Sequence, residues 1–100
     1  MIDLQFSPVA QHDLVRVEAS LWEAGDPLAA ELVGFVLDGL AVLTHQPGVG
    51  RPVADGLREL VINRGRGGYL ATYFFDPARQ RARVLRIRHQ REAGYTDQDI

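Results

Sequence analysis

The chain has 100 residues, of which 46% are hydrophobic and 24% charged, and it contains no cysteine. This composition is typical of one globular domain, and the absence of cysteine excludes disulfides and thiolate metal sites. No apolar run approaches the roughly 20 residues of a membrane-spanning helix, and no basic stretch typical of a signal peptide begins the chain. We therefore expect a single domain over residues 1–100, located in the cytoplasm and without a membrane anchor.

Charge is distributed unevenly along the chain. Residues 1–50 contain one arginine and seven acidic residues, whereas residues 51–91 contain ten arginines and three acidic residues. Every basic residue is arginine, whose planar guanidinium can bind a carboxylate or phosphate through two hydrogen bonds. The second half therefore suits an anionic partner. The alternative is a solvated surface whose arginines pair with the acidic first half.

The first two predicted elements are a short strand and a helix. Apolar residues alternate with polar ones over residues 2–6, which is typical of a half-buried strand. Ser7 and Pro8 match a helix cap followed by proline in the first turn, and apolar residues then recur at helical spacing to about Ala24. The polar residues that fall off this apolar face are His12, Asp13, Arg16 and Glu23.

A second helix is predicted over residues 27–45, after the break at Gly25. It is apolar around most of its circumference, so it needs cover from the first helix on one side and from a sheet on the other. Gly34 and Gly39 weaken a helix, which indicates a close backbone approach at these two positions. We expect the two helices to form an antiparallel hairpin.

Beyond residue 53 the hydrophobic period changes from that of a helix to that of a strand. Three strands are predicted, over residues 57–62, 69–75 and 82–89, and the segments between them have lengths typical of hairpins. The expected fold is therefore α+β, in the order β-α-α-β-β-β, with an antiparallel sheet and the helix hairpin packed on one face. The polar residues 90–100 are expected to form a loosely held tail.

Neither a cofactor nor a metal is predicted. The glycines of residues 48–50 and 65–68 match neither the dinucleotide fingerprint nor the phosphate-binding loop, and neither segment leads from a strand into a helix. Ser7 is explained as a helix cap, so a serine nucleophile is not expected. None of the three histidines has the sequence spacing typical of metal ligands: they are His12, His45 and His89.

The last predicted strand carries the most informative pattern. Its alternation directs Leu85 and Ile87 toward the helices and places on the opposite face Val84, Arg86 and Arg88. Arg58 can join this face across one bulge. This basic face suits nucleic acid or an acidic protein segment, and the alternative is a solvated strand face. The arginines assigned to loops or strand ends are Arg51, Arg64, Arg66, Arg83 and Arg91.

Four ordered stretches carry a family resemblance. Phe6-Ser-Pro-Val-Ala10 with Asp13-Leu14 leads from strand to helix, and Pro47-Gly-Val-Gly-Arg-Pro52 follows the second helix. Leu57-Arg-Glu-Leu-Val-Ile62 with Gly68-Tyr-Leu-Ala-Thr-Tyr73 corresponds to the predicted central strands, and residues 84–95 correspond to the last strand and the tail. Together they resemble the RelE/ParE superfamily of type II toxin–antitoxin toxins, especially its ParE-like branch.

This resemblance implies a growth-arresting toxin of the plasmid-stabilisation kind, neutralised in a complex with a cognate antitoxin. RelE-like members are ribosome-dependent mRNA endonucleases, whereas ParE-like members poison DNA gyrase without cutting RNA. This chain has no lysine, and Leu70 stands where the mid-sheet arginine of RelE-like members would follow Tyr69. The first hypothesis is therefore inhibition of DNA gyrase.

Each hypothesis assigns particular residues. For gyrase inhibition, the residues expected to contact the target are Arg86, Arg88, Arg91 and Tyr95. For the alternative of a ribosome-dependent endonuclease, His89 serves as acid or base, Arg88 and Arg91 bind the phosphate, and Tyr95 completes the C-terminal set. A third possibility is an inactive homologue that only binds its partner.

The antitoxin is expected to bind through an acidic, amphipathic segment that folds on binding. Its apolar side chains would lie against the helix hairpin or a groove of the sheet, and its carboxylates would pair with Arg58, Arg86 and Arg88.

Overall fold

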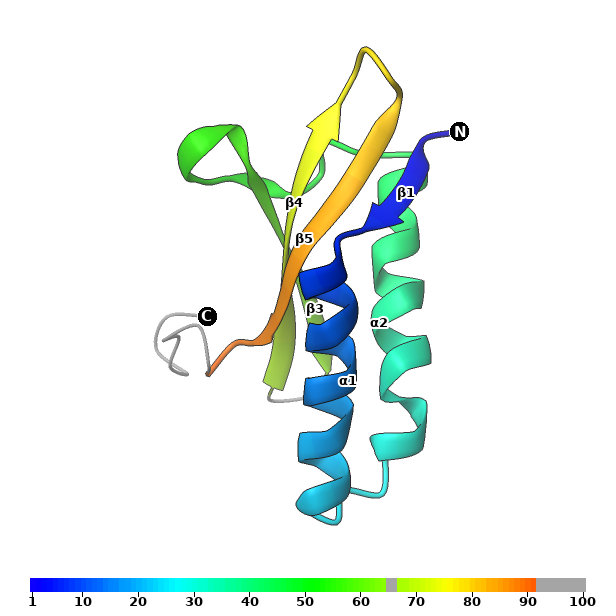
Figure 1. The fold of residues 1–100 in the computed structure, drawn as a ribbon, viewed down its shortest axis with the longest axis vertical. Helices are drawn as coiled ribbons and strands as arrows, with labels where there is room; N and C mark the ends of the chain where they lie inside the picture. Colours follow the sequence, from blue (N-terminus) through cyan, green and yellow to red (C-terminus); the bar gives the residue numbers. More distant parts are fainter. Residues whose placement is uncertain (65–66, 92–100) are drawn as a thin grey trace.

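The computed structural model describes residues 1–64 and 67–91. Two α-helices lie along one face of a five-stranded sheet with the strand order β1-β5-β4-β3-β2 (Figure 1). The strands are β1 (Asp3–Phe6), β2 (Arg51–Pro52), β3 (Arg58–Arg64), β4 (Gly67–Asp76) and β5 (Arg81–His89). The helices are α1 (Pro8–Glu23) and α2 (Leu32–Leu40), with short 3-10 helices η1 (Ala29–Glu31), η2 (Ala41–Thr44) and η3 (Ala54–Gly56).

The predicted α+β fold is confirmed, and its sheet is mixed rather than wholly antiparallel. The strands from β2 to β5 pair antiparallel, but β1 runs parallel to β5, with Asp3 opposite Arg81 and Phe6 opposite Val84. β1 and β5 are the first and last strands, so the helix hairpin and three other strands lie between them in the sequence. A long connection of this kind permits a parallel neighbour, which a two-residue hairpin does not.

The first helix begins and ends close to the predicted positions. The Ser7 hydroxyl oxygen accepts a hydrogen bond from the backbone N–H of Ala10 at 3.0 Å, and Pro8 occupies the first turn. Gly25 follows the helix with φ of +68°, a left-handed conformation that glycine adopts without strain. Asp13, which falls off the predicted apolar face, is nevertheless buried, with 4% of its surface exposed.

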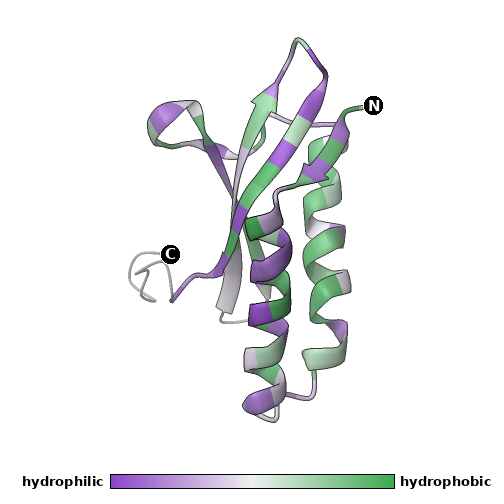
Figure 2. Cartoon of the chain, viewed as in Figure 1, coloured by the Kyte–Doolittle hydropathy of each residue, from purple (hydrophilic) through white to green (hydrophobic). Residues whose placement is uncertain are grey.

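The second predicted helix is divided between α2 and the 3-10 helices η1 and η2 at its ends. The Asp26 carboxylate accepts from the backbone N–H of Leu28 at 2.8 Å, just before η1 begins. Hydrophobic residues occupy most of α2 (Figure 2), which requires cover on more than one side. Its fully buried residues are Leu32, Val36 and Leu40.

The two glycines of α2 have different surroundings. A Cβ atom at Gly39 would lie 2.8 Å from Cγ2 of Ile62, so β3 leaves no room for a side chain there. At Gly34 the same construction meets no atom within 4 Å. The predicted close approach is therefore confirmed at Gly39 and wrong at Gly34.

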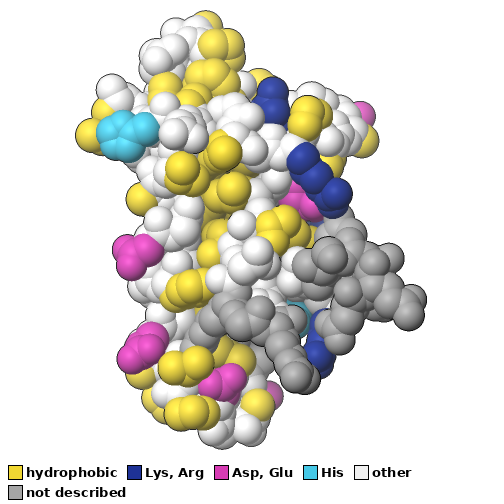
Figure 3. Space-filling view, turned by 180° about the vertical axis from the view of Figure 1, so that it is seen from behind, with side chains coloured by type: hydrophobic (Ala, Val, Ile, Leu, Met, Phe, Trp, Pro, Cys, Tyr) yellow, Lys and Arg dark blue, Asp and Glu magenta, His cyan; other side chains and the backbone are white. Residues whose placement is uncertain are grey.

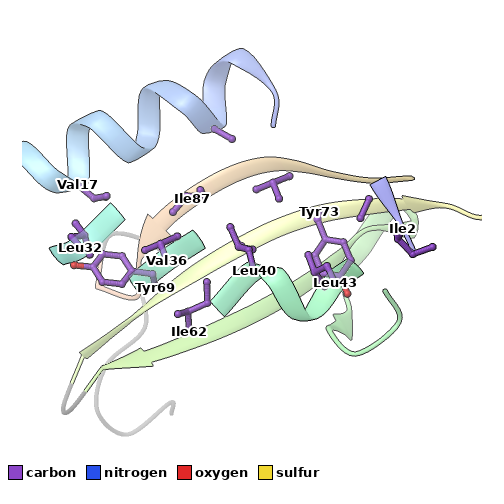
Figure 4. Packing of buried hydrophobic residues seen from close by; sticks show 14 residues of the cluster. Ile2, Val17, Leu32, Val36, Leu40, Leu43, Ile62, Tyr69, Tyr73 and Ile87 are labelled. Atoms are coloured by element: carbon purple, nitrogen blue, oxygen red, sulfur yellow. The ribbon is translucent and has the colours of Figure 1, made fainter. Parts of the chain in front are cut away.

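The hydrophobic core fills the layer between the helices and the sheet. In Figure 4, side chains from α1 and α2 face those from β3, β4 and β5 across this layer. Burial of such apolar surface is the dominant favourable term in folding. The larger members of the core are Leu32, Val36, Leu40, Leu43, Ile62, Tyr69, Tyr73 and Ile87.

Candidate functional site

A β-bulge divides β5 into two parts. Tyr73 of β4 lies opposite Val84, but the neighbouring Thr72 lies opposite Arg86, so Leu85 is an extra residue without a partner. Val84 and Ile87 are both fully buried against the helices. The prediction that placed Leu85 inward and Val84 outward was therefore wrong, because an extra residue reverses the alternation of side chains along a strand.

The bulge places four arginines on one face of the sheet. We call the face that α1 and α2 do not cover the outer face. Without the extra residue, the two arginines before the bulge and the two after it would point to opposite faces. Arg83, assigned from the sequence to a strand end, lies within β5. The outer-face arginines of β5 are Arg81, Arg83, Arg86 and Arg88.

Arg86 is paired within its own chain, although its side chain is 47% exposed. Its Nε donates a hydrogen bond to Oδ2 of Asp13 at 2.9 Å, and the backbone N–H of Ile87 donates to the same oxygen at 2.9 Å. Arg16 contacts the other carboxylate oxygen at 3.4 Å. Burial raises the pKa of Asp13, but the hydrogen bonds from Arg86 and Ile87 and the guanidinium charge outweigh it, so the pKa lies below its usual value of 3.8.

Side chains of the α1 region complete the edge of β5 where β1 ends. The Ser7 hydroxyl donates to the carbonyl oxygen of Leu85 at 2.9 Å. Farther along, Nη2 of Arg16 donates to the carbonyl oxygen of Ile87 at 3.4 Å, and Asp13 accepts from the N–H of the same residue. These contacts hold α1 against β5 and satisfy backbone groups that a neighbouring strand would otherwise bind.

Arg58 lies apart from Arg86 and Arg88. It pairs with Tyr73 across β3 and β4 and shares the parity of the core residue Ile62, so it lies on the helix side of the sheet. Its Nη1 donates to the carbonyl oxygens of Gly48, at 3.1 Å, and Gly50, at 2.7 Å. The three arginines expected to bind the antitoxin are therefore not brought together on one face.

His89 and Arg91 share a pocket beneath α1. The ring of His89 lies edge-on to Tyr69, with 5.3 Å between centroids, and Nδ1 accepts from the backbone N–H of Arg91 at 3.1 Å. Arg88 is opposite Leu70 on the outer face, so β5 separates it from His89. Tyr95 lies outside the described residues. The pocket, of about 270 Å³, is lined by Val17, Ser20, Leu21, Tyr69, His89 and Arg91.

Two outer-face arginines have no partner among the residues that the structure describes. Within residues 1–64 and 67–91, Arg83 and Arg88 make neither a hydrogen bond nor an ion pair. By contrast, Arg51 is paired with Glu59 at 2.6 Å. In the same part of the chain no three or more histidines, cysteines and carboxylates come together as a metal site, and no helix is long and apolar enough to cross a membrane.

Hydrophobic side chains also reach the surface of the helix hairpin. Seen from behind, they form a band along the molecule, with acidic side chains at its margin (Figure 3). Leu28 and Leu37 are exposed on the second helical segment, and Trp22 on the first. Exposed apolar surface is a common feature of protein-binding sites.

The family of the chain follows from its sequence over almost the whole fold. Residues 4–94 match the ParE toxin of type II toxin–antitoxin systems, parDE. The chain belongs to the ParE toxin family. No curated protein matches it. As a family member the toxin has an antitoxin as partner.

Solved structures agree with this fold. The toxin is similar to a chain of the chromosomal ParDE toxin–antitoxin system from P. aeruginosa, with a TM-score of 0.72 and 23% identity over 87% of this chain and 94% of that one. It is also similar to a chain of the RelBE2 toxin–antitoxin complex from Mycobacterium tuberculosis, with a TM-score of 0.56 and 22% identity over 88% and 96%.

Proposed function

We propose that the toxin inhibits DNA gyrase through the outer face of β5, with Arg88 and Arg86 contacting the target. The observation that carries this proposal is the separation of His89 from Arg88 by the strand itself. RNA cleavage needs a base for the 2′-hydroxyl and cations for the developing phosphorane charge at one place. Here the imidazole lies under α1 beside Arg91, while Arg88, which the nuclease hypothesis also places on the phosphate, is on the other side of the sheet.

Leu70 supports the same proposal. It occupies the middle of the outer face, between Val61 and Arg88, and is 2% exposed. A buried leucine at this position supplies no charge to a phosphoryl group. The outer face therefore offers arginines for binding without the set of groups that phosphodiester cleavage requires.

The experiment is a supercoiling assay with purified toxin, DNA gyrase and relaxed plasmid. We expect wild-type toxin to block supercoiling and Arg88→Glu to lose most of this effect, because the reversal places a carboxylate on the contact surface. His45→Glu, at an exposed position after η2, is the matched control and keeps full inhibition. Unchanged gyrase activity at saturating wild-type toxin would contradict the proposal.

A second candidate is ribosome-dependent mRNA cleavage, and the observation that favours it is the pocket shared by His89 and Arg91. In this case His89 is the acid or base, and Arg91 contributes charge. The expected result is mRNA cleavage on ribosomes by the wild type and none by His89→Ala, with both proteins folded. Cleavage by His89→Ala at the wild-type rate would exclude this candidate.

The third hypothesis is an inactive homologue that only binds its partner. It is supported if the wild-type toxin has no effect in either assay and does not arrest growth when its expression is induced.

For the antitoxin we propose an acidic amphipathic segment. Its apolar side chains cover the exposed hydrophobic band of the helix hairpin, and its carboxylates reach Arg86 and Arg88 around the β5 edge. Arg58 donates hydrogen bonds to two loop carbonyl oxygens of its own chain, so we expect it to contribute less than Arg86 and Arg88 to antitoxin binding. Charge attraction speeds association, and apolar anchors maintain the complex.

A further inference from the structure

A second pocket lies on the outer face, at the end of β5 far from His89. It has a volume of about 270 Å³ and is bordered by β1, β4, β5 and the β4–β5 turn. The proposed gyrase contacts, Arg86 and Arg88, and the pocket beneath α1 are not part of it. Its lining residues are Gln5, Phe74, Asp76, Arg79, Arg81 and Arg83.

The turn that closes this pocket is well fixed. Oδ1 of Asp76 accepts from the backbone N–H groups of Ala78, at 3.1 Å, and Arg79, at 3.3 Å. Its other oxygen pairs with Nη1 of Arg79 at 2.9 Å, and this hydrogen bond is the main reason that the pKa of Asp76 is lowered. The one carboxylate of the pocket is thus already occupied, which leaves the pocket with a positive balance.

Two arginines of the pocket have unused hydrogen-bonding capacity. Nε of Arg81 is buried, so it cannot reach a ligand, and it has no hydrogen-bond partner in the described part of the chain, but the side chain as a whole is 40% exposed. Its contact with the Asp3 carboxylate, at 3.6 Å, is too long for a hydrogen bond. Arg83 makes neither a hydrogen bond nor an ion pair within the same residues. Exposed guanidinium N–H groups that lack an acceptor can bind an oxyanion through paired hydrogen bonds.

Phe74 adds an aromatic surface beside these charges. It lies directly opposite Arg83 in the β4–β5 pairing and is 43% exposed, although it is a large apolar side chain. An aromatic ring next to guanidinium groups on a strand surface is the arrangement on which a nucleobase stacks while its phosphate is bound. An acidic peptide would use the arginines but would leave the ring without a matching planar group.

We propose that this pocket binds a phosphate ester of a nucleoside, with the phosphate on Arg81 and Arg83 and the base against Phe74. The volume is near the lower end of the range for small-ligand sites and suits one phosphate with part of a nucleoside. The ligand is either a free nucleotide or one unit of a single-stranded nucleic acid, because both present the same phosphate and base.

The test is titration of the folded toxin with adenosine monophosphate, adenosine and inorganic phosphate, followed by calorimetry and by NMR of the arginine Nε–H groups. We expect the monophosphate to bind severalfold more tightly than either of the other probes. Arg81→Gln combined with Arg83→Gln should weaken its binding at least tenfold. Phe74→Leu should weaken monophosphate binding and leave phosphate binding unchanged.

Arg88→Gln is the matched control for Arg83→Gln, because Arg88 likewise has no hydrogen bond or ion pair within the described residues, lies on the same strand and face, and its replacement also removes one charge. It should bind adenosine monophosphate as the wild type does. An equal loss in this variant would show diffuse attraction to a basic face and would overturn the site. So would binding of the monophosphate no tighter than inorganic phosphate, or no binding at all. If the double variant does not fold, Arg83→Gln alone takes its place.

Oligothymidylates of increasing length distinguish the two sources of the ligand. Affinity that rises with length identifies single-stranded nucleic acid, and affinity that stays constant identifies a free nucleotide; either result supports the site. The assays contain no gyrase, so failure of this proposal leaves the proposed function untouched. Conversely, if the toxin does not inhibit gyrase, the nucleotide-binding proposal is still tested by the binding measurements alone.

Discussion

At one edge of the sheet, β5 pairs with β1 and then with side chains of α1, whereas at the other edge β3 pairs with only the two residues of β2. Beyond Glu59, no further strand covers β3 within the described residues. Arginines take part in closing both edges, Arg86 through Asp13 and Arg58 through loop carbonyls. Arg86 and Arg58 therefore have partners within their own chain, whereas Arg88 has none within the described residues.

The largest expected effect comes from breaking the closed edge at Asp13. Asp13→Ala removes the acceptor for the buried N–H of Ile87 and the ion pair with Arg86, and should lower the free energy of unfolding by about 3 kcal/mol. Chemical denaturation measures this change. Asp3→Ala, which alters an exposed carboxylate of β1, should change stability little. An equal loss of unfolding free energy in the two variants would mean that the contacts of Asp13 do not hold α1 against β5.

The pH dependence of stability should report the same contact. The pKa of Asp13 is lower in the folded protein than in the unfolded chain, so its contribution is fully present above the usual value of 3.8. The contribution is lost as the pH falls through the folded pKa. We expect the free energy of unfolding of the wild type to fall more steeply below about pH 4 than that of Asp13→Asn. Parallel curves for the two proteins would contradict this assignment.

The sequence predicted the element order because its patterns are local. Capping by Ser7 and Pro8, the apolar second helix and the period-two strands each depend on a few neighbouring residues. The close approach at Gly39 could be inferred because glycine has few other reasons to lie within a helix.

The missing details depend on contacts between distant segments. The bulge at Leu85 has no signature in its own residues, since it is defined by the register of β4 against β5. The burial of Asp13 could not be predicted because its partners, Arg86 and Ile87, are more than 70 residues away in the sequence. The outer-face position of Arg83 follows from the bulge, so no reading of strand alternation alone would have found it.

A smaller loss of stability is expected at Tyr73, a residue of β4 that holds the loop before the short edge strand β2. This residue is fully buried, and its hydroxyl donates to the carbonyl oxygen of Pro47 at 2.7 Å and accepts from the N–H of Gly50 at 2.9 Å. Tyr73→Phe keeps the ring but leaves both loop groups unpaired, at a cost of about 1–2 kcal/mol. Thermal unfolding tests this value. A variant as stable as the wild type would show that water replaces the hydroxyl.

The sharpest separation of the two kinds of arginine should come from charge reversal on β5, with the smallest effect on folding at Arg88. Arg86→Glu and Arg88→Glu both weaken attraction to an acidic antitoxin, so each should slow association severalfold and flatten its salt dependence. Arg86→Glu also places a second carboxylate beside Asp13 and should destabilise the toxin, whereas Arg88 has no described partner to lose. Stopped-flow mixing with the cognate antitoxin at low and high salt measures the association rates, and unfolding curves measure the stabilities.

If both variants associate at the wild-type rate at low salt, the arginines of the outer face take no part in antitoxin binding. If Arg88→Glu unfolds as readily as Arg86→Glu, the distinction between an edge arginine and a free one fails.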